Sequence, residues 1–170
     1  DSIADLVAFL VIDHILNGEV LVDVLDEGLN LKGSAAALAT SLECALKLKE
    51  VSYMHSEAFA AGELKHGPIA LIDKRTLVVA TATMPSLFDK LKSNIVEVKS
   101  RGAATLVITQ CNDGSFGDSA DTVISIPQTD EAFISMLAII PAQLFAYYCA
   151  VQRGNDPDKP RNLAKSVTVE

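Results

Sequence analysis

The chain has 170 residues, 49% of them hydrophobic and 21% charged, and its 14 basic and 22 acidic side chains give a formal net charge of −8. This length predicts one domain with a full hydrophobic core, and the composition excludes intrinsic disorder. Binding to nucleic acid depends on a cationic surface, which an acidic chain of this kind does not favour. We therefore expect no nucleic-acid partner.

The apolar runs and the cysteines indicate in which cellular compartment the protein is expected. The longest apolar runs, such as residues 6–12 and 136–140, are much shorter than the ~18 residues needed to span a bilayer. The first residues lack the basic start and small-residue cleavage site of a signal peptide. The three cysteines have no CxxC spacing, which is typical of buried thiols in a reducing compartment. We expect a cytoplasmic protein without membrane contact.

Hydrophobic periodicity predicts helix, strand and helix in the first third of the chain. Apolar residues recur at helical spacing over residues 2–16, and residues 20–25 form an aliphatic run that suits a buried strand. Residues 38–48 are strongly helical. The preceding stretch, residues 32–37, is small and polar at its start, with Ser34 as a candidate N-cap. This stretch is either a loop leading into the helix or an engineered join.

The rest of the chain alternates between the two periodicities and ends in a polar tail. The predicted elements are a short helix at 58–64, a strand at 76–82, a helix at 85–99, strands at 104–109 and 122–126, and a long helix at 131–151. This order predicts an α/β fold with a parallel, doubly wound sheet flanked by helices. Residues 153–170 contain two prolines and no helical stripe, which predicts an extended tail.

Three charged residues share one face of the helix at 38–48 and its continuation. Ligands of open α/β sheets collect outside the carboxyl ends of the strands, so loops and helix ends are the first places to look for a site. Glu43 and Lys47 are four residues apart, and Lys47 and Glu50 are three apart. A carboxylate beside an ammonium could act as a proton-transferring base. Spacing alone favours the alternative, an exposed ion pair without function.

Two further residues could take part in chemistry. His66 lies between glycines, and an imidazole in such a loop could act as an acid or a base; a loop histidine bonded to the backbone fits equally well. Lys165 in the tail could form a Schiff base if desolvation lowers its pKa, although position alone favours a solvated lysine. No nucleotide-binding fingerprint and no metal-ligand spacing is present, so we expect no cofactor and no metal.

The chain resembles a known family in three stretches that occur in the family's order. The matching stretches are LECALKLKE at 42–50, AGELKHGP at 61–68 and PRNLAKSVTVE at 160–170. They resemble the glucosamine-6-phosphate synthases, the glutamine-dependent fructose-6-phosphate aminotransferases, in their second sugar isomerase (SIS) domain. The resemblance extends from about residue 42 to residue 170.

The resemblance implies an organisation for the chain and roles for its candidate catalytic residues. Residues 1–152 would form a flavodoxin-like SIS domain, with 1–41 atypical for the family, and residues 153–170 would form a catalytic tail. His66 would open the sugar ring, Lys165 would form a Schiff base with fructose 6-phosphate, and Glu50 would move a proton between the first two carbons, assisted by Lys47.

The resemblance also implies a substrate site and a partner. Glu43, Arg161 and Ala164 would bind the substrate, which is fructose 6-phosphate on one side of the reaction and glucosamine 6-phosphate on the other. In the family the histidine reaches the site from a neighbouring subunit, so a homodimer is implied.

The chain departs from the family in two respects. It reads Asp26-Glu27-Gly28 where the family has a Gly-Arg-Gly turn. It also contains neither the Ser/Thr-rich phosphate loop of the first SIS domain nor the glutaminase domain, so we expect no use of glutamine by this chain alone. The alternative is a non-catalytic module for sugar-phosphate binding or dimerisation.

Overall fold

The core of the fold is a five-stranded sheet in which all neighbouring strands are parallel. The computed structural model describes residues 20–24, 33–110 and 114–161. The strand order β2-β1-β3-β4-β5 is that of flavodoxin-like folds, which confirms the predicted doubly wound sheet. The strands are β1 (Val20–Val24), β2 (Ala58–Ala60), β3 (Leu77–Ala82), β4 (Ala104–Thr109) and β5 (Thr122–Ser125).

The central strands β3 and β4 are buried at every residue. Successive side chains point to opposite faces, so Leu77 and Val79 join one hydrophobic cluster while Val78 and Ala80 pack on the other side. A strand that is apolar at every position can be stable only when both faces of its sheet are covered. The continuous aliphatic runs of the sequence therefore require two layers of helices.

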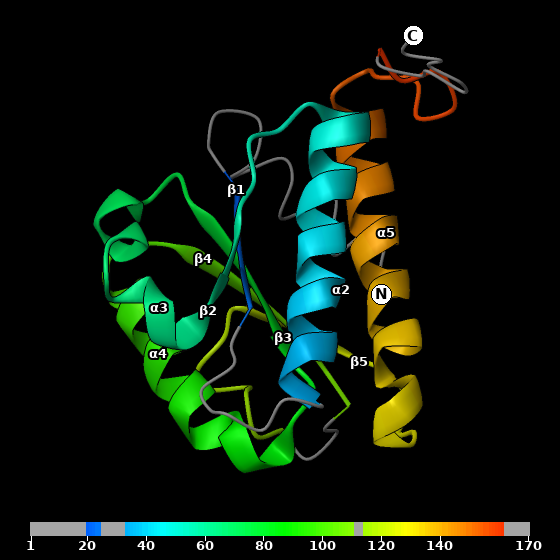
Figure 1. The fold of residues 1–170 in the computed structure, drawn as a ribbon. Helices are drawn as coiled ribbons and strands as arrows, with labels where there is room; N and C mark the ends of the chain where they lie inside the picture. The colour runs from blue at the N-terminus through cyan, green and yellow to red at the C-terminus, as the bar shows by residue number, and fades with distance from the viewer. Residues whose placement is uncertain (1–19, 25–32, 111–113, 162–170) are drawn as a thin grey trace, which may run out of the picture.

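Helices cover both faces of the sheet (Figure 1). On one face α2 and α5 lie side by side and run in the same direction, and on the other face lie α3 and α4. The α-helices are α2 (Gly33–Lys47), α3 (Ala61–Leu64), α4 (Phe88–Ser100) and α5 (Ile134–Gln152). A π-helical turn η2 (Leu48–Ser52) continues α2, and 3-10 turns are found at η3 (Pro68–Leu71), η4 (Pro85–Leu87) and η5 (Glu131–Phe133).

The larger hydrophobic cluster lies between the sheet and the α2–α5 layer. Phe145 is its bulkiest fully buried member, followed by leucines such as Leu48, and it includes the thiols of Cys44 and Cys149. Burial raises the pKa of Cys44 to about 12 and also raises that of Cys149. Both thiols are free and buried, as predicted for two of the three cysteines; Cys111 lies outside the described residues.

Two local predictions were wrong. Residues 58–60 form the edge strand β2 instead of the first turn of a helix, because Ala58 packs on one face of the sheet and Phe59 on the other. Ser34 is the second residue of α2 and not its N-cap, and the helix includes the small-residue stretch from Gly33 onward. The predicted helix at 2–16 and turn at 26–28 lie outside the described residues.

The segment Glu131–Gln152, formed by η5 and α5, is long and apolar enough to cross a membrane, with a mean hydropathy of 1.7 over its most apolar 18-residue window. Of that window 44% is buried, and α5 packs against α2 and β4. A core helix has the same composition as a membrane span. The expected cytoplasmic location and lack of membrane contact stay predictions.

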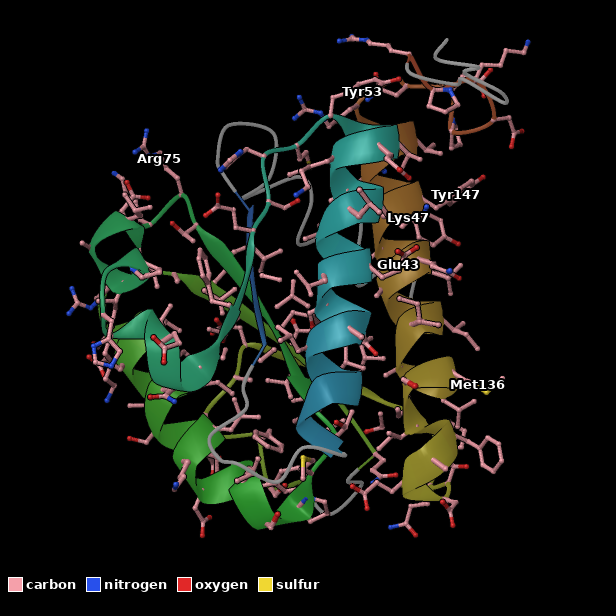
Figure 2. All side chains as sticks on the ribbon, in the orientation of Figure 1. Glu43, Lys47, Tyr53, Arg75, Met136 and Tyr147 are labelled. Carbon is pink, nitrogen blue, oxygen red and sulfur yellow. The ribbon has the colours of Figure 1, made fainter. Side chains whose placement is uncertain are left out.

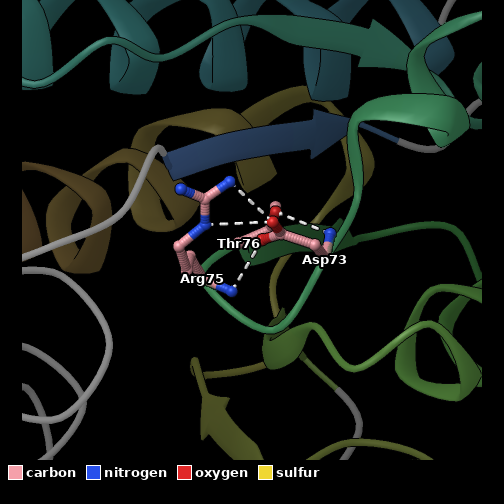
Figure 3. A network of polar contacts seen from close by, with 3 residues as sticks. All are labelled: Asp73, Arg75 and Thr76. Atoms are coloured by element: carbon pink, nitrogen blue, oxygen red, sulfur yellow. Dashed lines mark hydrogen bonds and ion pairs between the residues drawn. The ribbon is translucent and has the colours of Figure 1, made fainter.

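A polar turn precedes β3 (Figure 3). The Asp73 carboxylate accepts hydrogen bonds from the backbone N–H of Arg75 at 2.8 Å and from its guanidinium at 2.7 and 3.0 Å. The Asp73 backbone N–H donates to the Thr76 hydroxyl at 3.1 Å. The hydrogen bonds from Arg75 lower the pKa of Asp73. Hydrogen bonds within residues 73–76 therefore close the turn.

A second carboxylate, Asp121, joins the start of β4 to the end of α4. It accepts hydrogen bonds from the backbone N–H and the hydroxyl of Thr105 at 2.9 and 2.8 Å, and it pairs with Lys99 at 2.7 Å. Partial burial alone would raise the pKa of Asp121, but the hydrogen bonds from Lys99 and Thr105 lower it below its ordinary 3.8. The ionised carboxylate thus stabilises the fold.

We expect Asp121→Asn to lower the free energy of unfolding by about 1–2 kcal/mol at pH 7, because the amide loses the charge-assisted hydrogen bonds in a partly solvated position. The difference from the parent protein should shrink as the pH falls through the lowered pKa of Asp121, where its carboxylate is protonated. Urea unfolding at several pH values measures both effects. Asp118→Asn, at a nearby exposed position, should change little; an equal loss there would contradict the assignment.

Candidate active site

The C-terminal end of α2 lies toward the amino edge of the sheet. The helix connects two parallel strands, so it runs back against their direction. The Ser41 hydroxyl lies 2.9 Å from that of Thr81 near the end of β3, and Glu50 lies further along the helix, away from that edge. The charged residues are therefore remote from the carboxyl edge, where ligands of such sheets usually bind.

The structure brings Glu43, Lys47 and Glu50 together, as their spacing predicted (Figure 2 labels the first two). The Lys47 Nζ atom lies 2.8 Å from Oε2 of Glu50 and 3.5 Å from Oε1 of Glu43. The three side chains are 34–45% exposed. This is the geometry of an exposed ion-pair network that presents two carboxylates to solvent.

Lys47 is held in its charged form. Its hydrogen bond to Glu50 raises its pKa, partial burial opposes this, and the charges of both carboxylates add to the increase. A lysine whose pKa is raised does not act as a base near neutral pH. In this group Lys47 can therefore orient a carboxylate, and proton acceptance is left to the carboxylates.

The helix that carries these residues ends in an unusual way. Its last turn, Leu48–Ser52, is π-helical, a geometry found frequently at functional sites. The Ser52 hydroxyl donates to the Leu48 carbonyl at 2.6 Å, and Tyr53 then adopts a left-handed conformation with φ 58°. The sequence contains neither glycine nor asparagine at this position, so pattern reasoning missed this helix end.

The described part of the tail, residues 153–161, folds back onto this helix end and is turned instead of extended as predicted. The Asn155 side chain donates to the Ser52 carbonyl at 3.2 Å, and the Arg161 backbone N–H donates to the Tyr53 hydroxyl at 2.8 Å. The Arg161 guanidinium stacks 4.2 Å from the centre of the Tyr53 ring. Lys165 and Ala164 lie outside the described residues.

A cavity of about 520 Å³ opens between the tail and the helix ends. Its lining is polar and includes two arginines. The lining residues are Tyr53, Gln152, Arg153, Asn155 and Arg161. Of these, only Arg161 was among the candidate site residues.

His66 lies elsewhere in the described part of the chain. It is exposed in the turn between α3 and η3, where its backbone N–H donates to the Glu63 carbonyl at 3.0 Å. The flanking Leu64 packs in the cluster on the α4 side of the sheet, whereas Leu48 and the rest of the α2 end pack on the opposite side. One chain therefore does not bring His66 to Glu50.

A second group of polar atoms lies at the carboxyl edge of the sheet. Thr83 follows β3, and its carbonyl accepts from the Gln110 side chain at 3.3 Å. The Thr83 hydroxyl and the Gln110 side-chain carbonyl are buried without a partner among the described residues. Within the same residues, no three His, Cys, Asp or Glu side chains gather as a metal site.

Fold and site together define a doubly wound α/β domain whose C-terminal tail contacts the end of α2 next to the charged residues. The family model of the SIS domain matches residues 31–153. The chain therefore belongs to the SIS domain family, as the sequence motifs predicted.

Two relatives in sequence carry the same enzyme name. The chain is 52% identical over 138 residues to the glutamine–fructose-6-phosphate aminotransferase (isomerizing) of Clostridium tetani, an alignment that covers 81% of the chain and 23% of the relative. The enzyme of the same name from Methanosarcina mazei is 54% identical over 130 residues, 76% of the chain and 21% of the relative. The chain thus spans less than a quarter of these relatives.

Solved structures of sugar-phosphate enzymes have a similar fold. The C-terminal domain of glucosamine-fructose-6-phosphate aminotransferase from Francisella tularensis matches with a TM-score of 0.72 and 30% identity, covering 92% of the chain and 41% of that structure. A glucosamine-6-phosphate deaminase from Thermotoga maritima matches with a TM-score of 0.68 and 30% identity, covering 97% and 46%.

We expect Lys47→Met to change the free energy of unfolding by less than ~1 kcal/mol, because exposed ion pairs contribute little to stability. Urea unfolding at low and high salt would measure the change, with Lys49→Met on the neighbouring exposed position as the control. A loss of several kcal/mol in the free energy of unfolding would show that the ion-pair network stabilises the helix end. It would argue that these residues serve stability and not catalysis.

Proposed function

We propose that this chain is the part of a glucosamine-6-phosphate synthase that binds fructose 6-phosphate and takes part in its isomerisation and amination to glucosamine 6-phosphate. One observation carries the proposal: the tail that leads to Lys165 is anchored beside the helix end that carries Glu43, Lys47 and Glu50. Relatives about half identical to the chain, named for this activity, support it.

In this proposal Lys165 and Glu50 carry the central steps. The Lys165 amine attacks the C2 carbonyl of the open-chain sugar, and loss of water leaves a Schiff base. Ammonia then adds to this Schiff base and displaces the Lys165 amine, so the imine nitrogen that stays at C2 comes from ammonia. Glu50 takes a proton from C1 and returns it at C2, while Lys47, at 2.8 Å, orients the Glu50 carboxylate. Glu43, Arg161 and Ala164 contact the substrate.

His66 opens the sugar ring in this scheme, but from another subunit. Its exposed turn faces away from the α2 end of its own chain, on the other side of the sheet. A site that needs both His66 and Glu50 is therefore shared between two copies, and we propose a homodimer on this ground.

Borohydride reduction in the presence of fructose 6-phosphate tests the Schiff base. We expect a covalent adduct that peptide mass mapping assigns to Lys165 and that is lost in Lys165→Ala. Lys159→Ala, at a neighbouring lysine of the same tail, should keep the adduct. A folded parent protein that gives no adduct at Lys165 would refute covalent catalysis by this chain.

Glu50→Gln tests the proton transfer separately. The amide cannot accept a proton, so exchange of deuterium from heavy water into C1 of fructose 6-phosphate should fall by roughly 10²–10⁴-fold. The adduct at Lys165 should persist, because Glu50 acts after it forms. NMR of the recovered sugar measures the exchange, with Glu57→Gln as a control on another exposed carboxylate. Unchanged exchange in Glu50→Gln would assign the base elsewhere.

A second candidate function is a non-catalytic module for binding or dimerisation. The outer faces of α2 and α5 favour it, because they expose large apolar side chains that a packing surface would use. These are Leu42 and Leu46 on α2 and Met136, Ile140, Tyr147 and Val151 on α5. Lys165→Ala separates the two functions, since it should leave binding or dimerisation intact.

A further inference from the structure

Tyr53 holds a backbone conformation that its side chain does not favour. With φ 58° and ψ 31° it ends the π-helical turn in the left-handed region, and it is the one non-glycine residue with positive φ among those the structure describes. Helices that end this way usually place glycine or asparagine there, since a Cβ atom makes the conformation costly. A strained residue persists when its side chain has a use that offsets the strain.

The use of the Tyr53 side chain is its contact with the tail. Its hydroxyl accepts a hydrogen bond from the Arg161 backbone N–H at 2.8 Å, and its ring lies under the Arg161 guanidinium at 4.2 Å. These residues are 108 positions apart in the sequence. The Asn155–Ser52 hydrogen bond, at 3.2 Å, holds the tail at a second point next to the first. In Figure 2, Tyr53 lies at the helix end that faces the tail.

This contact lies between the two residues proposed to act on the substrate. Glu50 precedes Tyr53 by three residues, and Lys165 follows Arg161 by four. Four residues of fully extended chain span at most ~14 Å. With Arg161 held at Tyr53, chain length alone limits how far from Arg161 the Cα atom of Lys165 can lie. Without this contact, the remaining hydrogen bond between the described tail and the helix end is that of Asn155.

We propose that Tyr53 is a positioning residue: it holds Arg161 at the helix end that carries Glu50, and so limits the distance from which Lys165, four residues further on, can reach that end. This inference rests on the proposed function and adds to it a residue that touches neither the substrate nor the reacting atoms. Arg161 is exposed and Tyr53 only half-buried, so the Tyr53–Arg161 contact can break without disturbing the buried core.

Tyr53→Phe is the test, because it removes the hydroxyl and keeps the ring under the guanidinium. The rate of borohydride-trapped adduct at Lys165 is measured over a range of fructose 6-phosphate concentrations. We expect the maximal rate to fall by roughly three- to tenfold, the effect of losing one hydrogen bond. The half-saturating concentration should change by a smaller factor than the maximal rate, because Arg161 is only one of the proposed substrate contacts. The urea midpoint should fall by no more than the loss of one hydrogen bond allows. Trypsin should cleave faster after Arg161 in the variant.

Tyr147→Phe is the matched control, since it deletes the same atom from an exposed tyrosine on α5 and should leave trapping and cleavage at the parent rates. Asn155→Ala removes the second anchor and should lower the trapping rate in the same direction as Tyr53→Phe.

Three results would overturn the inference, and they differ from one another. Equal trapping rates in Tyr53→Phe and the parent protein refute the positioning role and leave the proposed function intact. A lower rate accompanied by a fall in the urea midpoint larger than one hydrogen bond allows, with unchanged cleavage after Arg161, assigns Tyr53 to stability alone. No adduct at Lys165 in the parent protein refutes the proposed function, and the positioning role with it.

Discussion

Burial of the central strands on both faces is the constraint on which the rest of the structure depends. Because β3 and β4 are buried at every residue, helices must cover both sides of the sheet, and each helix must run back against the strands it connects. This places the C-terminal ends of α2 and α5 at the same edge (Figure 1). The tail leaves α5 at that edge and meets the end of α2 there.

The candidate site is built on this scaffold from interactions that are individually weak. Exposed ion pairs at Lys47 and single hydrogen bonds at Tyr53 and Ser52 contribute little to folding, which depends on the buried clusters. Residues at such a site can be selected for chemistry and position, since the core supplies the stability. The strained backbone at Tyr53 is consistent with this: the strain is unfavourable for folding, and it occurs at a residue whose side chain the site uses.

The elements that could be predicted were those whose pattern is strong and local. The aliphatic runs of β3 and β4 and the long apolar stretch of α5 are found where they were expected. Residues 58–60 were not, because an edge strand of three residues, Ala-Phe-Ala, is too short to show an alternation and alanine favours helix. The turned tail was missed because its hydrogen-bond partners lie far away in the sequence.

Local sequence was sufficient for the fold class and for the Glu43–Lys47–Glu50 face, because helical spacing alone brings residues three and four apart together. The motifs were also sufficient for the family. Long-range packing was needed for the rest: it brings Arg161 to Tyr53 and puts His66 on the side of the sheet opposite the α2 end. No local pattern encodes such contacts, since they depend on how separate elements pack around a shared sheet.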